Sequence, residues 1–136
     1  MAFRAKARGE RGTMSDVKFY RCNHCGNIVA VIEDGGVNPV CCGEKMELLT
    51  ANTTDAAVEK HVPVVTEDGG LLQVVVGSVE HPMLPEHYIE WIAYADGEKL
   101  VVKKLKAGDE PKATFHKGAE RGTVYAYCNL HGLWKA

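Results

Sequence analysis

Hydrophobic and polar positions follow two different patterns along the chain. Between about residues 51 and 136, short runs rich in β-branched and aromatic residues alternate with turn sequences such as Asp96-Gly97. Short apolar runs bounded by such turns are typical of β-strands. The predicted strands cover residues 61–66, 71–76, 87–95, 99–105, 113–115 and 123–128. Because this part carries no long helical repeat, we predict an all-β sandwich in which residues 54–60 form one helical turn or a loop.

The stretch from about residue 15 to residue 50 is shorter, poor in apolar residues and rich in cysteine. The runs 27–33 and 46–50 are predicted to be small strands joined by turns that contain Gly and Pro. A segment of fewer than about 40 residues rarely buries enough apolar surface to fold without a metal, a disulfide or a partner. We therefore expect two domains, a small metal-dependent module at 15–50 and a larger domain at 51–136.

Composition and charge place the chain among ordinary globular proteins. Of its 136 residues, 46% are hydrophobic and 25% are charged. No apolar run approaches the roughly 18 residues of a membrane-spanning helix, so no membrane span is expected. The formal charge of −2 gives no general attraction to nucleic acid.

The amino-terminal segment differs from the rest of the chain in its charge. Residues 1–13 carry four basic side chains and one acidic side chain, which leaves the remainder near −5 because the total is −2. We expect residues 1–14 to be a basic extension that is either disordered or a non-native start. An upstream start codon, a non-native remnant and a real basic arm all remain open. The segment lacks the apolar core of a secretory signal, so we expect a cytoplasmic protein.

Five cysteines are an odd number, so they cannot all pair as disulfides within one chain. A reducing compartment leaves such thiols free to bind metal. Four of them lie in the small module, as Cys22-x2-Cys25 and the adjacent pair Cys41-Cys42. Two such pairs make a tetrahedral sulfur site, although adjacent ligands should distort the tetrahedron. The spacing alone favours zinc and a single iron equally.

The larger domain holds a second set of candidate metal ligands. It contains one cysteine, Cys128, and five histidines, His61, His81, His87, His116 and His131. Cys128-x2-His131 is a chelating pair, and His81-x5-His87, stiffened by two prolines, can close a second arc on the same ion. Strand ends and loops are where a rigid sandwich brings such side chains together. The alternative, that these are ordinary surface or packed histidines, stays open at this point.

With both ligand sets in view, the sequence resembles desulfoferrodoxin, the two-iron form of superoxide reductase. The resemblance covers residues 15–136 and rests on motifs from both parts of the chain. They are Cys22-Asn23-His24-Cys25-Gly26-Asn27, Cys41-Cys42-Gly43-Glu44-Lys45-Met46, Glu59-Lys60-His61-Val62-Pro63, His81-Pro82-Met83, His87-Tyr88-Ile89-Glu90-Trp91-Ile92 and Cys128-Asn129-Leu130-His131-Gly132-Leu133-Trp134. No ligand of the family's pattern is missing, and the extension at 1–14 is the clear departure.

The resemblance implies a desulforedoxin-like module at residues 15–50, followed by an immunoglobulin-like β-sandwich at 51–136. It also implies two iron ions per chain. Cys22, Cys25, Cys41 and Cys42 would hold one iron, while His61, His81, His87 and His131 would be equatorial ligands and Cys128 the axial ligand of the other. The implied activity is the one-electron reduction of superoxide to hydrogen peroxide, which detoxifies superoxide in an anaerobe or microaerophile.

The same resemblance assigns roles to two charged residues beside a ligand. Lys60 would guide superoxide to the site and stabilise the peroxide, and Glu59 would be the sixth ligand of the oxidised iron. Taken alone, the two residues also fit a solvated charge pair in a loop. Backbone amides near Leu130 and His131 are expected to hydrogen-bond the Cys128 sulfur.

Four further residues are expected to lie outside the ligand sets. We expect His24 to point to solvent, His116 to be structural, and Trp91 and Trp134 to pack in the core. The expected partners are superoxide, an electron donor such as rubredoxin and a second copy of the chain in a homodimer, with no nucleic acid and no membrane.

Two other functions remain open from the sequence. One is a two-iron electron carrier without catalytic turnover. The other is a zinc ribbon fused to a sandwich that grips nucleic acid. The charge near −5 of residues 14–136 disfavours the second, because nucleic-acid binding relies on a basic surface.

Overall fold

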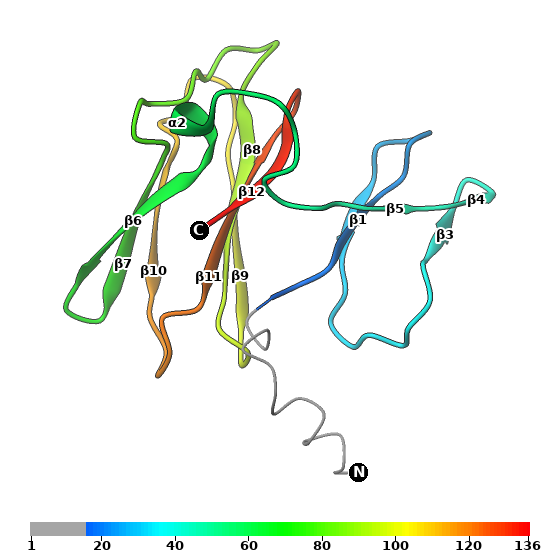
Figure 1. Ribbon diagram of the computed structural model, residues 1–136, viewed down its shortest axis with the longest axis horizontal. Coiled ribbons are helices and arrows are strands. Elements are labelled where there is room, and N and C mark those ends of the chain that lie inside the picture. The colour runs from blue at the N-terminus through cyan, green and yellow to red at the C-terminus, as the bar shows by residue number, and fades with distance from the viewer. Residues whose placement is uncertain (1–15) are drawn as a thin grey trace. The chain divides into compact units, whose positions relative to one another are not determined.

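The computed structural model describes residues 16–136, and the predictions for residues 1–14 lie outside this range. The described chain divides into two compact units (Figure 1). One unit is formed by residues 17–50, and the other by residues 51–136 together with Asp16. Paired strands in both units are antiparallel.

The small unit combines a three-stranded sheet with a short hairpin. The sheet has the order β2-β1-β5, from β2 (Ile28–Ala30), β1 (Phe19–Arg21) and β5 (Glu47–Leu48). The hairpin pairs β3 (Val40–Cys41) with β4 (Glu44–Lys45). The sequence pattern predicts strands at β2 and β5 and misses the other three, because segments of two or three residues are too short to show alternation.

A buried cluster in this unit joins its apolar core to its predicted metal site. Tyr20, Cys22 and Met46 are buried together, and Val31 and Cys41 pack against them. Two members of the cluster are thus predicted metal ligands. Such a small apolar core fits the expectation that a bound ion contributes to the stability of the unit.

The larger unit is a sandwich of two antiparallel sheets. One sheet has the order β10-β7-β6 and the other the order β12-β11-β8-β9. The strands are β6 (Pro63–Asp68), β7 (Leu71–Val76), β8 (Ile89–Ala95), β9 (Leu100–Lys104), β10 (Lys112–His116), β11 (Thr123–Cys128) and β12 (Gly132–Lys135). A three-plus-four antiparallel sandwich is the immunoglobulin-like architecture that was predicted.

The core of the sandwich follows from alternation along its strands. In β7, Leu72, Val74 and Val76 are buried while Gln73 between them is exposed. Because successive side chains of a strand point to opposite faces, one face of β7 lines the core. These side chains belong to one buried cluster with Ile89, Ile92, Tyr94, Leu105, Ala113, Phe115, Val124, Ala126 and Cys128.

Two predicted strand starts are wrong, and both errors concern metal-ligand candidates. His61 does not begin a strand but ends the helical turn α2 (Val58–His61), and β6 starts only at Pro63. His87 forms an isolated bridge with Leu84, two residues before β8 begins. The helical turn itself is one of the two alternatives predicted for residues 54–60. The strand β12 was not predicted, because a run of four residues after a turn carries little periodicity.

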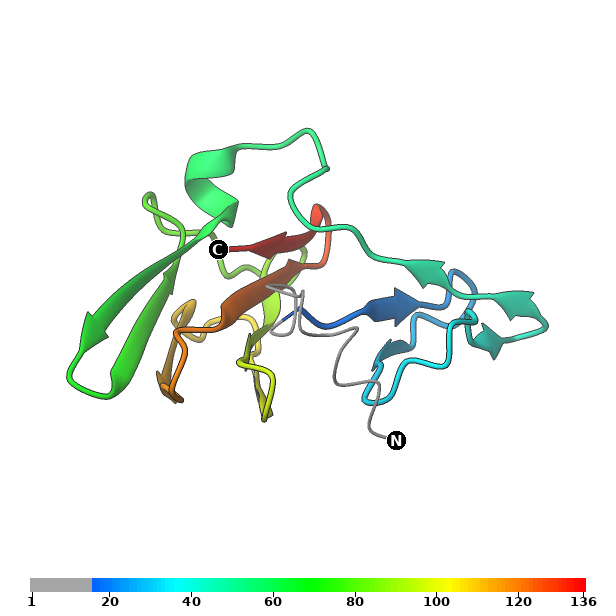
Figure 2. The same ribbon diagram turned by 60° about the horizontal axis from the view of Figure 1, so that its bottom comes forward.

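Several chain segments meet at one end of the sandwich, uppermost in Figure 1. The register pairs Cys128 at the end of β11 with Ile89 at the start of β8 and with Gly132 at the start of β12. Figure 2 shows α2 as the turn that leads directly into β6. The start of β6 pairs with the end of β7, so the segment that follows β7 begins at this end as well. This end of the sandwich therefore collects the residues predicted to bind metal.

Candidate metal centres

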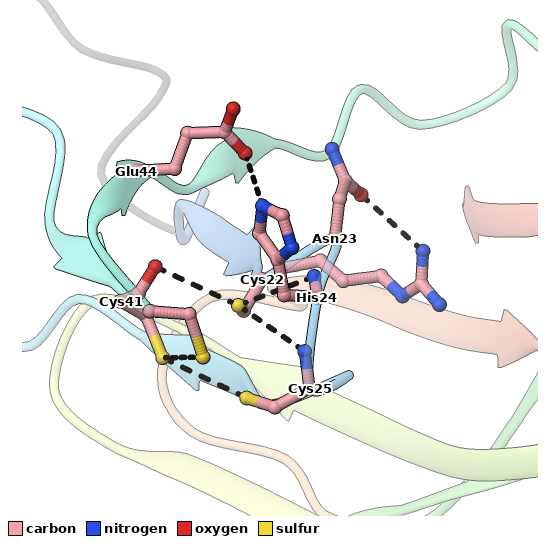
Figure 3. A network of polar contacts seen from close by, with 8 residues as sticks. Cys22, Asn23, His24, Cys25, Cys41 and Glu44 are labelled. Carbon is pink, nitrogen blue, oxygen red and sulfur yellow. Dashed lines mark hydrogen bonds and ion pairs between the residues drawn. The ribbon is translucent and has the colours of Figure 1, made fainter.

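The four cysteines of the small unit form one cluster (Figure 3). Their Sγ atoms lie within 4.8 Å of one another. The Cys25 and Cys41 sulfurs are 3.6 Å apart, and the Cys41 and Cys42 sulfurs are 3.9 Å apart. Four sulfurs at about 2.3 Å from a central ion in a tetrahedron lie about 3.8 Å from one another. The separations therefore fit four ligands of one ion, and all four thiols are free of disulfides.

Backbone conformation explains how adjacent cysteines serve one site. Successive side chains in an extended strand point to opposite faces. Cys42, however, has a φ of +54° and Gly43 a φ of +77°, so the chain turns sharply after Cys41. On the other side, Gly26 has a φ of +83° and closes the Cys22–Cys25 turn, in which the Gly26 N–H donates to the Cys22 carbonyl. Glycine after each cysteine pair is thus used for its conformational freedom.

The electrostatics of the cluster favour a cation at its centre. The backbone N–H groups of Cys25 and His24 donate to the Cys22 sulfur at 3.4 Å and lower the pKa of this thiol to about 6. Hydrogen bonds among the neighbouring thiols raise the pKa of Cys42 to about 12. The Cys22 thiolate is therefore stabilised by the backbone, whereas Cys41 and Cys42, whose pKa values are raised by neighbouring thiols, need a positive ion before they ionise.

His24 makes a contact that the sequence did not predict. Its side chain is about half exposed, as expected, but Nε2 lies 2.7 Å from Oε1 of Glu44 (Figure 3). This pair connects the Cys22–Cys25 turn to the β3–β4 hairpin. The two residues are 20 positions apart, so no local pattern indicates the contact.

In the sandwich, four histidine rings form a closed square. The rings of His61, His81, His87 and His131 follow one another around it, with neighbouring centroids 4.6, 4.7, 5.0 and 4.9 Å apart. The diagonal from His61 to His87 is 6.3 Å. Neighbouring rings are steeply inclined to one another, at 78° to 89°, whereas the rings on this diagonal are inclined by only 29°. The structure thus brings together the four histidines that the resemblance names as ligands, and their equatorial role stays a prediction.

The hydrogen bonds of two rings leave lone pairs that face each other. Nδ1 of His61 donates to the Ala57 carbonyl at 2.7 Å, and Nδ1 of His81 donates to the Pro82 carbonyl at 2.7 Å. In the neutral ring, Nε2 is then an acceptor. The two Nε2 atoms nevertheless lie 3.2 Å apart. Two acceptors at this distance repel unless a cation lies between them, and nitrogens bonded to one metal at about 2.1 Å and a right angle are about 3 Å apart.

Burial favours the neutral form of three of the four histidine rings and so keeps them available as ligands. It lowers the pKa of His81 to about 4, and it lowers the pKa values of His61 and His87 as well. Nε2 of His87 is buried and has no hydrogen-bond partner among the described residues. A buried nitrogen without a partner is costly, and a bound ion would satisfy it. The donor set thus fits a metal ion.

Cys128 joins this group from the core side. Its sulfur lies within 4.8 Å of ligand atoms of His61, His87 and His131. The strand register shifts by one residue between Tyr127 and Cys128, and a bulge of this kind redirects a side chain. The cysteine is fully buried.

Two opposing effects act on the Cys128 sulfur. Burial raises the pKa of its thiol, while the backbone N–H groups of Leu130 and His131 act to lower it. The two amides that were expected to interact with the sulfur therefore act on it. Because the net shift is upward, a thiolate at this position depends on a neighbouring cation.

Glu59 and Lys60 lie in α2, immediately before His61, and both side chains are exposed. Burial lowers the pKa values of His61 and His87, and the positive charge of Lys60 lowers both further. The Lys60 charge is thus felt at two corners of the square. The catalytic roles assigned to Glu59 and Lys60 remain predictions.

The backbone of this pair is held by the segment that follows β7. The Glu59 carbonyl accepts from the Val79 N–H at 2.9 Å and from the Ser78 hydroxyl at 3.3 Å. Gly77 packs against the same peptide: a Cβ atom built on it would lie 2.4 Å from the Glu59 carbonyl oxygen and 2.7 Å from the Lys60 carbonyl carbon. No sequence motif identifies this close approach, although an isolated glycine after a strand is compatible with one.

Burial bears on the remaining predictions for the two tryptophans and for His116. Trp91 is buried and stacks on Tyr127, and Trp134 is buried as well, which confirms the prediction of core packing. His116 is exposed at the end of β10 and belongs to neither ligand cluster.

Among the described residues, no helix has the length and apolar character needed to cross a membrane.

Comparison with known proteins relates both clusters to one family. The profile described as "Desulfoferrodoxin, N-terminal domain" matches residues 15–49, and the profile described as "Desulfoferrodoxin" matches residues 53–136. The chain is 49% identical over 122 residues to the desulfoferrodoxin of Clostridium acetobutylicum, covering 90% of this chain and 97% of that protein. It is also 49% identical over 119 residues to the desulfoferrodoxin of Nitratidesulfovibrio vulgaris, covering 88% and 94% of the two chains.

A solved structure extends the similarity to three dimensions. The crystal structure of the superoxide reductase from Treponema pallidum matches with a TM-score of 0.73 and 34% identity. The match covers 89% of this chain and 98% of that one. The match is longer than either unit alone, so it includes residues of both units.

Proposed function

The chain belongs to the desulfoferrodoxin family, and from this premise we propose that it is a superoxide reductase that binds two iron ions. One iron belongs to the four-cysteine cluster and the other to the histidine square with Cys128. The reaction consumes one superoxide, one electron and two protons and yields one hydrogen peroxide. Iron(II) held by the square is a one-electron reductant, and this is the chemistry it supplies when bound.

The observation that carries the proposal is the closed square of four histidines with one cysteine sulfur beside it. Neutral imidazoles leave the charge of a bound cation uncompensated, so the site attracts an anionic substrate. A structural site with four ligands in a tetrahedron would not need a fifth donor, whereas this set offers five. The Cys128 sulfur donates electron density, and the N–H groups of Leu130 and His131 moderate that donation.

Lys60 is the residue that we assign to substrate attraction. Its exposed ammonium group acts on His61 and His87, so a positive charge lies on the approach to the square. A fixed charge beside a small site raises the association rate of an anion. The same charge stabilises the peroxide product. The two protons come from water, which reaches the exposed residues of α2. Glu59, in the same turn, is assigned as the residue that would supply the sixth ligand when oxidised iron is bound.

Further assignments complete the proposal. Residues 15–50 act as the desulforedoxin-like module and residues 51–136 as the reductase domain. The electron donor is a rubredoxin-type protein, and the working form is a homodimer. A cytoplasmic location is supported by five free cysteines, which a reducing compartment preserves.

The stoichiometry of superoxide consumption tests the function. The iron-loaded chain is mixed with a superoxide source under excess reductant, and peroxide, oxygen and oxidised reductant are measured together. A reductase gives one peroxide per superoxide and no oxygen from superoxide, whereas dismutation gives half as much peroxide and releases oxygen. The variant His87→Ala should lose the activity, and His116→Ala, which alters an exposed histidine outside both clusters, should keep it. An unchanged rate in His87→Ala would contradict the assignment.

A further inference from the structure

Asn129 follows Cys128 directly and binds the backbone on both sides of His87. Its Oδ1 accepts from the Tyr88 N–H at 2.9 Å, and its Nδ2 donates to the Glu86 carbonyl at 3.1 Å. The backbone N–H of Asn129 also donates to the Tyr88 carbonyl, at 3.2 Å. Three hydrogen bonds thus join the Cys128 loop to the His87 segment, although more than 40 residues separate them in sequence.

His87 needs such support more than His61 and His81 do. His61 and His81 each anchor Nδ1 on a backbone carbonyl, which fixes the ring directly. His87 instead presents a buried Nε2 without a partner among the described residues. It lies outside β8, and an isolated bridge joins its backbone to that of Leu84. The direction of its ring is therefore set through the backbone on either side, where Asn129 binds.

The amide of Asn129 is not occupied by the sulfur of its neighbour. Burial raises the pKa of the Cys128 thiol, and the backbone N–H groups of Leu130 and His131 act against that rise. The side chain of Asn129 is half-buried and faces the other loop. The Cys128 sulfur is thus influenced by the backbone N–H groups of Leu130 and His131. The side chain of Asn129 is left to join the Cys128 loop to the His87 segment.

We propose that Asn129 is a positioning residue that holds His87 in register with Cys128, so that the histidine square and the sulfur close on one ion. Asparagine suits this task because it offers an acceptor and a donor in a fixed plane. Aspartate would keep the bond from the Tyr88 N–H but set a carboxylate oxygen against the Glu86 carbonyl. Alanine would remove both bonds and leave the two backbone groups unpaired. The inference rests on the proposed function only for the identity of the ion.

Iron retention in the full, iron-loaded chain tests the proposal. The variants Asn129→Ala and Asn129→Asp are challenged with an excess of a chelator, and the visible absorption of each iron site is followed over time. We expect Asn129→Ala to speed iron loss from the sandwich site on the order of 10- to 100-fold, the usual effect of removing a residue that orients a ligand. Asn129→Asp should fall between it and the original chain. The absorption of the four-cysteine site serves as an internal reference and should be unchanged.

Asp96 provides a control at the opposite end of the sandwich, in the turn that follows β8. Its Oδ1 accepts from the backbone N–H groups of Glu98 and Lys99, both at 3.0 Å, so it also makes a pair of bonds to the backbone. Asp96→Ala should lower the thermal midpoint without speeding iron loss. Equal iron loss in Asp96→Ala and Asn129→Ala, or retention in both Asn129 variants, would overturn the proposal. A chain that holds iron as described but reduces no superoxide would refute the proposed function and leave the role of Asn129 intact.

Discussion

Trp134 stacks on His61, with ring centroids 4.9 Å apart and an interplanar angle of 28°. Its indole N–H also donates to the backbone carbonyl of His131 at 3.1 Å. One buried side chain from β12 therefore contacts two neighbouring corners of the histidine square. Packing in the core and orientation of the metal ligands are achieved by the same residue.

This contact predicts two different effects of substitution at Trp134. Trp134→Ala should lower the free energy of unfolding of the iron-loaded chain by about 3–5 kcal/mol and change the visible spectrum of the sandwich iron. Trp134→Phe keeps a ring against His61 but loses the bond to His131, so about 1 kcal/mol should be lost. Urea unfolding and absorption spectra measure both effects. Trp91→Phe, which alters a tryptophan stacked on Tyr127, should leave the spectrum unchanged; a shift there would argue against a specific role of Trp134.

Gly77 is predicted to set the position of the Glu59–Lys60 peptide. In Gly77→Ala, the added methyl group would meet backbone atoms at 2.4 and 2.7 Å, so α2 must move away from the segment after β7. The second-order rate constant with superoxide should fall by roughly 10- to 100-fold, as expected for a shift of about 1 Å. Pulse radiolysis measures this constant. Gly70→Ala is the control, since no atom lies within 4 Å of the new methyl group and its φ is not positive; a normal rate in Gly77→Ala would exclude the positioning role.

Lys60→Ile tests electrostatic attraction of the substrate. Removal of the ammonium group should lower the second-order rate constant by about tenfold at low ionic strength and flatten its dependence on salt. Lys99→Ile removes a similar exposed lysine from the turn between β8 and β9. That turn follows the end of β8, whereas the square adjoins the start of β8, so this control should behave as the unaltered chain does. Identical salt dependence in Lys60→Ile and the unaltered chain would refute steering by Lys60.

The metal-free sandwich should lose stability as the pH falls. His81 has a folded-state pKa of about 4, below its usual value of 6.5, because burial disfavours its charged form. The unfolded chain then binds more protons than the folded chain between these two values, so the free energy of unfolding decreases from about pH 6.5 down to about pH 4 and this contribution levels off below. His61 and His87, whose pKa values are also lowered by burial, act in the same direction.

Tryptophan fluorescence follows this transition in the sandwich alone, because both tryptophans, Trp91 and Trp134, belong to that unit. Urea titrations at several pH values yield the slope. His81→Gln should make the slope shallower, and His116→Ala, which alters an exposed histidine, should not. A metal-free chain with equal stability at pH 7 and pH 4.5 would show that the buried histidines are not held neutral.

Much of the fold was predictable because it depends on local alternation. The predicted strands 71–76 and 123–128 coincide with β7 and β11, where long runs of β-branched or aromatic residues lie between clear turns. The predicted strands that begin at His61 and His87 start too early. In the sequence, a histidine just before a strand cannot be told from the first residue of that strand. The helical turn and the isolated bridge that hold these two histidines depend on contacts with other loops.

The sequence by itself determined the chemistry of the protein: two ligand sets, their residue types and their division between a small module and a sandwich. Spacing marked the candidate cysteines and histidines, and the motifs that resemble desulfoferrodoxin assigned them to the two ligand sets. Tertiary structure alone decided which ring nitrogens meet. His61 and His131, for example, are 70 residues apart in sequence, yet Nε2 of His61 faces Nδ1 of His131. It also decided that Asn129, Trp134 and Gly77 hold the ligand-bearing segments in place. Such contacts join residues that only strand pairing brings together, so no local pattern carries their signal.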